Sequence, residues 1–415
     1  MTAPLLNPCE LEIDLFCRGV RIDPSCDLDH DARRYSRTRA GLGSGLELVI
    51  PGDLKKIFMN VPTGESFTAS SPYLLEKRDG SYRVVHDDGR AYDVIVPQEP
   101  RWYSGQTSAG TPNMEVGVLQ GTYLGIYVGD TCSFWHGEAL DRCQFCTTGL
   151  NVGSSEKAVK TVEDVVDVCR VAREESGVTF VHLNSGYQGG DGLRKVAPYV
   201  KAIKEKVGML VGVQLMPSRD HSNYDRLIDL GADHFSFCYE FHNPEYFERY
   251  LPGKTRVAGQ KLFFEALEYT SRKMGKGRVS GEIIAGVEPV EDTLRAIDYI
   301  TGVGAFPTIC IFRPLKGSVM EDLPSPGYEE MRRVMEAMYH ACRRRGIGIG
   351  LAPNIEVSLI CQPDDARYLG RRDLSWRLYE WRLKLLRLAT TPLFRRKLTP
   401  QPRPSLVEVG FAAGS

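Results

Sequence analysis

The chain has few cysteines, no excess of charge of either sign and no long apolar run. Its 11 cysteines among 415 residues are too few for a disulfide scaffold, and their odd number prevents complete pairing within one chain. Lys and Arg number 52 against 53 Asp and Glu, which argues against broad electrostatic binding of nucleic acid or of an anionic membrane. No stretch of about 20 apolar residues is present, so we expect no membrane-spanning helix.

The first residues also lack the features of an export signal. The opening MTAPLLNPCELEID has neither a basic n-region nor an apolar h-region. Hydrophobic residues make up 42% and charged residues 25% of the chain, which is typical of globular proteins and argues against disorder. We therefore expect a cytoplasmic protein whose thiols are free or bound to a metal.

The hydrophobic pattern divides the chain into three units. Residues 1–112 are predicted to form a β-rich extension, with a hairpin turn at 87–89. Residues 113–355 alternate short apolar strands with amphipathic helices, which is typical of a parallel sheet covered by helices. Six to seven such units predict a partial or closed parallel (β/α) barrel in the α/β class, with its last strand at 347–351. Residues 356–415 are predicted to form a helical tail.

The tail contains one clear helical pattern. Leu374, Leu378, Trp381, Leu385 and Leu388 recur at alternating steps of four and three, which predicts an amphipathic C-terminal helix that packs on the barrel. Basic side chains lie mostly off that stripe. We expect them to form a solvated face rather than a membrane or nucleic-acid surface, because the charge of the whole chain is close to zero.

Three cysteines after the first strand of the predicted barrel are the strongest chemical signal. Ten residues separate Cys132 from Cys143, and two separate Cys143 from Cys146. The short spacing lets two thiolates face one metal centre, and Cys132 can fold back to supply a third. Iron–sulfur clusters take thiolate ligands, usually four, so three would leave one iron open to chelate an amine and a carboxylate.

This group resembles the cysteine motif of the radical S-adenosylmethionine (radical SAM) superfamily. Members carry three cysteines after the first barrel strand and an aromatic residue just before the third, where this chain has Phe145. The first gap departs from the family's usual three residues, and the longer loop costs about 1 kcal/mol of closure entropy. The resemblance implies a [4Fe–4S] cluster on Cys132, Cys143 and Cys146 that cleaves SAM with one electron, and a 5′-deoxyadenosyl radical that abstracts hydrogen from a small molecule. It also implies an electron donor such as flavodoxin or ferredoxin.

Later strand ends carry residues that the resemblance assigns to SAM binding. Ser185, Gly186 and Gln188 follow the second strand, where the family has a turn that binds the SAM amine, although no acid stands at the third place. Glu240 ends the fourth strand and would contact the ribose or amino group. On the fifth strand, Ile283 would pack on adenine and Gly286 would belong to the same motif. These implied contacts are to cofactor rather than to substrate.

Three residues are candidates for substrate binding. Arg313 ends the sixth strand and could bind an anionic group or pair with a core acid. Gln214 on the third strand and Asn354 after the seventh are further candidates. Arg249 could pair with the SAM carboxylate or be an exposed helix arginine. The sequence contains neither a second cysteine-rich segment nor a cobalamin motif, which favours a single cluster and a small-molecule substrate.

Two alternatives use the same cysteines differently. Cys132, Cys143, Cys146 and His136 could form a Cys₃His zinc site in a binding protein without radical chemistry. A cluster that only carries electrons would need a fourth thiolate, for which Cys238 is the best candidate, although such a cysteine is more often a small buried apolar residue. Iron with acid-labile sulfide would distinguish the cluster from one zinc ion per chain.

Overall fold

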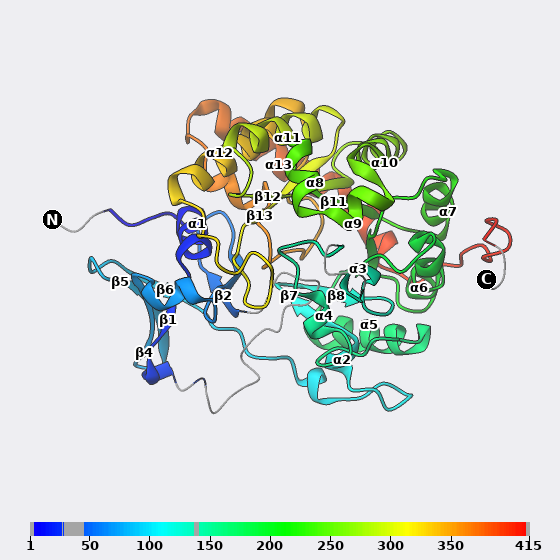
Figure 1. Cartoon of the computed structure of the whole chain (residues 1–415), viewed down its shortest axis with the longest axis horizontal. Helices are drawn as coiled ribbons and strands as arrows, with labels where there is room; N and C mark the ends of the chain where they lie inside the picture. Colours follow the sequence, from blue (N-terminus) through cyan, green and yellow to red (C-terminus); the bar gives the residue numbers. More distant parts are fainter. Residues whose placement is uncertain (1–3, 27, 29–44, 137–140, 412–415) are drawn as a thin grey trace.

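A seven-stranded sheet forms the centre of the protein (Figure 1). The computed structural model describes residues 4–26, 28, 45–136 and 141–411. Strands β8 to β13 run parallel in sequence order, and β7 pairs antiparallel with β8 at one edge. The strands are β7 (Val118–Gln120), β8 (Tyr123–Tyr127), β9 (Phe180–Asn184), β10 (Leu210–Gln214), β11 (His234–Glu240), β12 (Val279–Ala285) and β13 (Phe306–Ile311). The predicted partial barrel is confirmed.

Helices cover the outer face of this sheet. Local signals set their ends: Thr161 forms a capping box with Asp164 at the start of α5, and Gly177 ends that helix with a φ of 65°. The covering helices are α5 (Val162–Ser176), α6 (Gly192–Lys206), α7 (Ser222–Leu230), α10 (Gly259–Met274), α11 (Val290–Gly302) and α12 (Tyr328–Arg345). Shorter helices lie in the connections: α2 (Asn113–Val116), α3 (Ser133–His136), α4 (Thr148–Asn151), α8 (Pro244–Tyr250) and α9 (Pro252–Val257).

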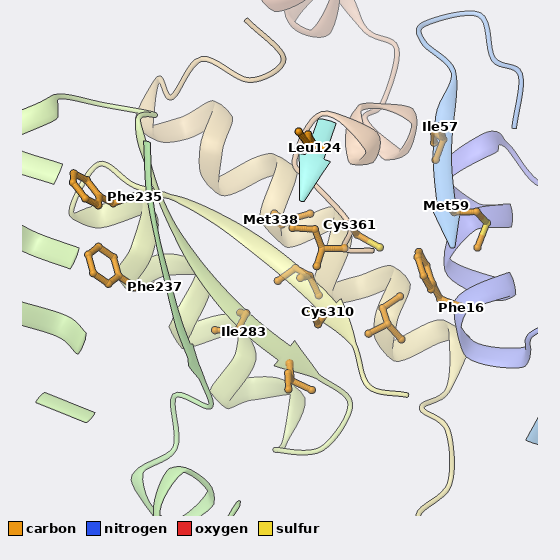
Figure 2. Close-up of a cluster of buried hydrophobic side chains, with 14 of the residues drawn as sticks. Phe16, Ile57, Met59, Leu124, Phe235, Phe237, Ile283, Cys310, Met338 and Cys361 are labelled. Carbon is orange, nitrogen blue, oxygen red and sulfur yellow. The ribbon is translucent and has the colours of Figure 1, made fainter. Parts of the chain in front are cut away.

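The predicted β-rich extension is present and packs beside the half-barrel. After α1 (Pro8–Arg18) it has one sheet in the order β1-β4-β5-β6 and a hairpin of β2 and β3. Its strands are β1 (Arg21–Ile22), β2 (Leu46–Ile50), β3 (Ile57–Val61), β4 (Tyr73–Arg78), β5 (Ser81–His86) and β6 (Ala91–Val94). Figure 2 shows Phe16, Ile57 and Met59 of the extension in the same apolar cluster as Cys310 on β13. The hydrophobic core is therefore continuous between the two.

An irregular segment lies between the two edges of the half-barrel. Val357 forms an isolated bridge with Gly121, next to β7, and Cys361 forms one with Ile309 on β13. The prediction of a further strand at 347–351 is wrong, because this segment is irregular in the structure. Its glycines explain the difference: Gly348 and Gly350 alternate with the apolar residues, Gly350 has a φ of 59°, and glycine lowers strand propensity.

The C-terminal helix α13 (Leu374–Lys397) is present, but it packs through a different face from the one predicted. Its buried residues are Trp376, Tyr379, Glu380 and Leu383, whereas the predicted stripe beginning at Leu374 faces solvent. Both sets recur at helical spacing, so periodicity alone could not choose between them. The buried guanidinium of Arg367 settles the choice, because its Nε donates to Glu380 at 3.1 Å.

No helix in the described ranges has the length and the apolar character needed to cross a bilayer.

Candidate functional site

A cavity of about 540 Å³ occupies the lumen of the half-barrel. Side chains alternate along each strand, so every second residue faces the cavity. At the amino ends of the strands the lining is aromatic and includes Phe180, His234 and Phe306. At the carboxyl ends it is polar and includes Gln214 and Glu240. The lumen therefore has a reactive, thiol-bearing end and an opposite end where aromatic rings lie beside charged residues such as Asp233 and Arg278.

The three predicted metal ligands meet the cavity at its carboxyl end. Cys132, Cys143 and Cys146 all line it, and each is partly buried. Burial raises the pKa of all three thiols, and for Cys143 and Cys146 the neighbouring thiols of the group add to the effect. A bound metal centre would reverse this trend, because a coordinated thiol is deprotonated.

Local hydrogen bonds and packing hold the cysteine loop in place. The backbone N–H of Gln144 donates to the Tyr250 carbonyl at 3.0 Å, and its side-chain amide donates to the Arg249 carbonyl at 2.7 Å. The ring of Phe145 is buried and lies 6.2 Å from that of Phe241. The predicted aromatic residue before Cys146 thus anchors the loop to the segment after β11.

The second strand connection lies directly against the first cysteine. A Cβ atom on Gly186 would lie 2.4 Å from Cβ of Cys132 and 2.7 Å from its sulfur, so only glycine fits there. The N–H of Gly186 donates to the Tyr127 hydroxyl at 2.9 Å, and Ser185 also lines the cavity. Gln188 accepts a hydrogen bond from the N–H of Asp130 at 3.1 Å and so supports the loop before Cys132.

The donor set can be tested against the two metal interpretations. Within the described ranges, no three Cys, His, Asp or Glu side chains are close enough to share one metal ion. Ligands of a [4Fe–4S] cluster each bind a different iron, so they surround a larger volume than the ligands of one zinc ion. Three thiols around the end of a single cavity fit the cluster. The side chain of His136, the fourth ligand of the zinc interpretation, lies outside the described part.

Glu240 is placed at the cavity by an irregularity at the end of β11. The register against β12 shifts between Cys238 and Glu240, and Glu240 has a φ of 66°, which is uncommon for a residue with a side chain. Nζ of Lys254, on α9, donates to the Glu240 carboxylate at 2.9 Å and to the Cys238 carbonyl at 2.6 Å. Lys254 therefore fixes both the bulge and the carboxylate.

Sequence reasoning missed Lys254, because no spacing relates a lysine on a short helix to a strand that ends 14 residues earlier. Burial alone would lower the pKa of Lys254, but Glu240 and the nearby thiols of Cys143 and Cys238 raise it above its usual value. The ammonium is thus charged. It provides the positive charge beside a group of thiols and carboxylates.

Glu282 is a second missed residue, and it lies deeper in the cavity. Sγ of Cys238 donates to Oε1 of Glu282 at 3.1 Å, and Nε2 of Gln214 lies 3.3 Å from Oε2. Burial, reinforced by the charge of Glu240, raises the pKa of Glu282 to about 7. The alternation of β12 was the available signal, since Glu282 must face the opposite side from Ile283.

Ile283 and Gly286, the fifth-strand residues that the resemblance assigns to SAM binding, lie near Glu282 but outside the polar lining of the cavity. Ile283 is fully buried on the outer face of β12, in the hydrophobic core (Figure 2). Gly286 has a φ of 98°, and a Cβ there would lie 2.4 Å from Pro326. The neighbouring Glu288 accepts the N–H groups of His242 and Asn243 at 2.9 Å each, which ties the end of β12 to the loop after β11.

Of the three substrate candidates, the structure brings Gln214 to the cavity. Arg313 instead forms an ion pair with Glu65 of the extension at 2.5 Å, which is the core pairing considered above. Asn354 lies at the other end of the half-barrel and donates to the Gly177 carbonyl at 2.9 Å. The guanidinium of Arg249 lies over the ring of Tyr250, 5.2 Å from its centroid.

Sequence comparison with known proteins returns a hydroxylase. No family model matches the chain. The chain is 22% identical over 249 residues to bacteriochlorophyllide c C-7(1)-hydroxylase of Chlorobaculum limnaeum. That alignment covers 54% of this chain, and it spans only 61% of the length of the curated relative.

Solved structures give matches over a larger share of the chain. Methylornithine synthase (PylB) is 15% identical and covers 64% of this chain and 82% of its own, with a TM-score of 0.39. A radical SAM methyltransferase from Sphaerobacter thermophilus is 14% identical and covers 70% of this chain and 81% of its own, with a TM-score of 0.40. One of these two structures is, by its title, a radical SAM enzyme, the superfamily that the cysteine motif of this chain resembles.

Proposed function

We propose that this chain is a radical SAM enzyme that acts on a small molecule. The observation that carries the proposal is the meeting of Cys132, Cys143 and Cys146 at one end of the lumen, beside the Glu240–Lys254 ion pair. When bound to these thiolates, a [4Fe–4S] cluster would supply the one-electron cleavage of SAM and thus a radical able to abstract hydrogen.

The protein's own part is to bind, orient and shield. Gly186 lets the Cys132 side chain pack directly against the turn after β9, and Glu240 offers a carboxylate to a ribose hydroxyl or an ammonium. Lys254 keeps that carboxylate in position. Aromatic side chains such as Phe134 and Phe145 line the same end of the cavity and exclude water from it.

The substrate would occupy the inner part of the lumen. Gln214 and Glu282 line that part of the cavity, deeper than the cysteines, and offer hydrogen-bonding groups to a substrate. The cavity volume of about 540 Å³ must hold both the nucleoside part of SAM and the substrate, which favours a small molecule. All 11 cysteines are free, which favours a reducing compartment, the cytoplasm, where a flavodoxin or ferredoxin would donate the electron.

The test is SAM cleavage by the anaerobically reconstituted full chain with a reduced flavodoxin. We expect 5′-deoxyadenosine to form with the wild type and to be absent with Cys132→Ala, Cys143→Ala or Cys146→Ala. A fully loaded cluster that forms no 5′-deoxyadenosine in the presence of a cell extract as the source of substrate would contradict the proposal. One zinc ion per chain with no sulfide would instead support the Cys₃His alternative.

A further inference from the structure

Helix α13 carries a continuous apolar stripe on its solvent side. Leu374, Leu378, Trp381, Leu385 and Leu388 are between 54% and 74% exposed. Steps of four and three place all five on one side of the helix, over about four turns. Single exposed leucines are ordinary on protein surfaces, but four leucines and a tryptophan on one side of a helix mark an interaction surface.

The orientation of α13 is fixed by its opposite face, so the stripe cannot turn inward without breaking buried contacts. Tyr379 donates to the Ile347 carbonyl at 3.3 Å, and its ring lies 6.1 Å from that of Tyr339 on α12. The carboxylate of Glu380 is held by the buried guanidinium of Arg367. The exposed stripe is therefore a property of the folded chain.

Basic residues border the stripe on both sides. Helical spacing puts Arg377 and Lys384 along one side and Arg382 along the other, and all three are exposed. Arg395 and Arg396 follow in the last turn. The acid in the helix, Glu380, is buried in its pair with Arg367. None of the ion pairs in the described part of the chain includes Arg377, Arg382 or Lys384.

This charge pattern identifies the occupant. A second copy of the chain would bring its own basic border against this one, and like charges repel. An anionic bilayer instead offers acyl chains for the leucines and the tryptophan and headgroup charges for the basic border. We propose that α13 is a membrane-surface helix that docks the protein on an anionic lipid bilayer, with the stripe at the boundary between headgroups and acyl chains.

The inference concerns the surface of the protein and is independent of the function proposed for the lumen. It differs from the sequence-based expectation of a solvated basic face. The near-zero net charge of the whole chain does not oppose membrane binding. Salt screens interactions between exposed charges beyond about 8–10 Å, so the local charge of α13 determines its attraction to an anionic surface. The expected binding mode is peripheral.

The test is co-sedimentation of the full chain with vesicles of phosphatidylcholine alone or with about 30% phosphatidylserine. We expect binding to the anionic vesicles, weakening with salt, and a shift of Trp381 emission to shorter wavelength. Leu378→Glu with Trp381→Glu should lower binding by about 100-fold or more. Arg377→Gln and Lys384→Gln should each lower it by about fivefold.

Val407→Glu is the matched control, because Val407 is equally exposed but lies outside α13. It should bind vesicles as the wild type does, and all variants should keep the wild-type circular dichroism spectrum. Equal vesicle binding by the wild type and Leu378→Glu/Trp381→Glu would overturn the proposal. So would a dimer without lipid that the same double substitution converts to a monomer, since the stripe would then belong to a second copy.

Discussion

The two ends of the lumen are built from the same strands but have opposite characters. At the carboxyl ends, loops bring together three thiols, a carboxylate and an ammonium. At the amino ends, the rings of Phe180, His182, His234 and Phe306 pack with centroid separations of 5.6–6.2 Å. One cavity thus has a thiol-bearing end and an opposite floor lined mainly by aromatic rings.

Burial acts in different ways at the two ends. At the floor it lowers the pKa of His182 to about 3 and that of His234 to about 4, so both rings are neutral at physiological pH. At the reactive end, Lys254 remains charged because Glu240 is 2.9 Å away. The two buried histidines are therefore neutral, whereas the buried lysine keeps its charge because a carboxylate lies next to it.

The largest difference between the ends should appear when cysteines are removed. Cys143→Ala is expected to abolish cluster assembly and SAM cleavage while leaving the unfolding free energy almost unchanged. Cys169→Ala is the matched control on the buried side of α5, where the loss of a sulfur should cost about 1–2 kcal/mol but leave iron binding intact. Iron content and denaturant unfolding of both variants measure this. If Cys169→Ala lost its iron while Cys143→Ala kept it, the proposed roles of the two cysteines would be refuted.

The next largest effect is expected from Lys254→Met. Removing the ammonium leaves the Glu240 carboxylate buried without its partner, which should cost about 3–5 kcal/mol in unfolding free energy. The double variant Lys254→Met with Glu240→Gln should recover most of that loss, although SAM binding should stay weak. Unfolding curves and SAM titration separate the two effects. Equal stability of the wild type and Lys254→Met would show that the Glu240–Lys254 ion pair does not stabilise the fold.

A smaller, pH-dependent effect is expected from Glu282→Gln. The folded-state pKa of Glu282 is raised to about 7, so its protonated form stabilises the fold fully below about pH 4.5 and this contribution is lost as pH rises toward 7. The substitution should flatten the pH dependence of the unfolding free energy in that window by up to about 1.4 kcal/mol per pH unit. Glu288 and Glu356 also have a pKa raised to about 7, so some slope should remain. An unchanged slope would contradict this assignment.

The smallest effect is expected at the floor, from His182→Phe. In the described part of the chain Nε2 of His182 has no hydrogen-bond partner, and the ring is neutral, so a phenyl ring of similar size should replace it at a cost below about 1.5 kcal/mol. Iron content and SAM cleavage should match the wild type. A large loss of SAM cleavage at full iron content would place His182 among the functional groups and break the comparison.

The sequence predicted the fold well wherever the signal was local. The alternating strands and helices of the half-barrel were predicted, because strand alternation and helical spacing are set by near neighbours. The prediction of a strand at 347–351 was wrong because the apolar residues of this segment alternate with glycines. The hydrophobic pattern does not record the conformational freedom of glycine. The buried face of helix α13 was predicted wrongly, because the pairing of Glu380 with Arg367, 13 residues earlier in the chain, is not part of the hydrophobic pattern.

The site divides in the same way. Cys132, Cys143 and Cys146 could be found from spacing alone, and the structure brings all three to one cavity. Lys254 could not, because its partnership with Glu240 depends on a strand bulge that leaves no mark in the sequence. Arg313 appeared equally placed for substrate, yet Glu65 of the extension holds it, a contact between residues 248 positions apart. Long-range pairing is the part that one sequence does not reveal.

The most direct measurement of the central claim is the iron and acid-labile sulfide content of the full chain purified without air. About four of each per chain, falling toward zero in Cys132→Ala, Cys143→Ala and Cys146→Ala, is the result expected for a cluster held by three thiolates at the carboxyl end of the lumen. A wild-type chain without iron, or three variants that keep all of it, would contradict the account.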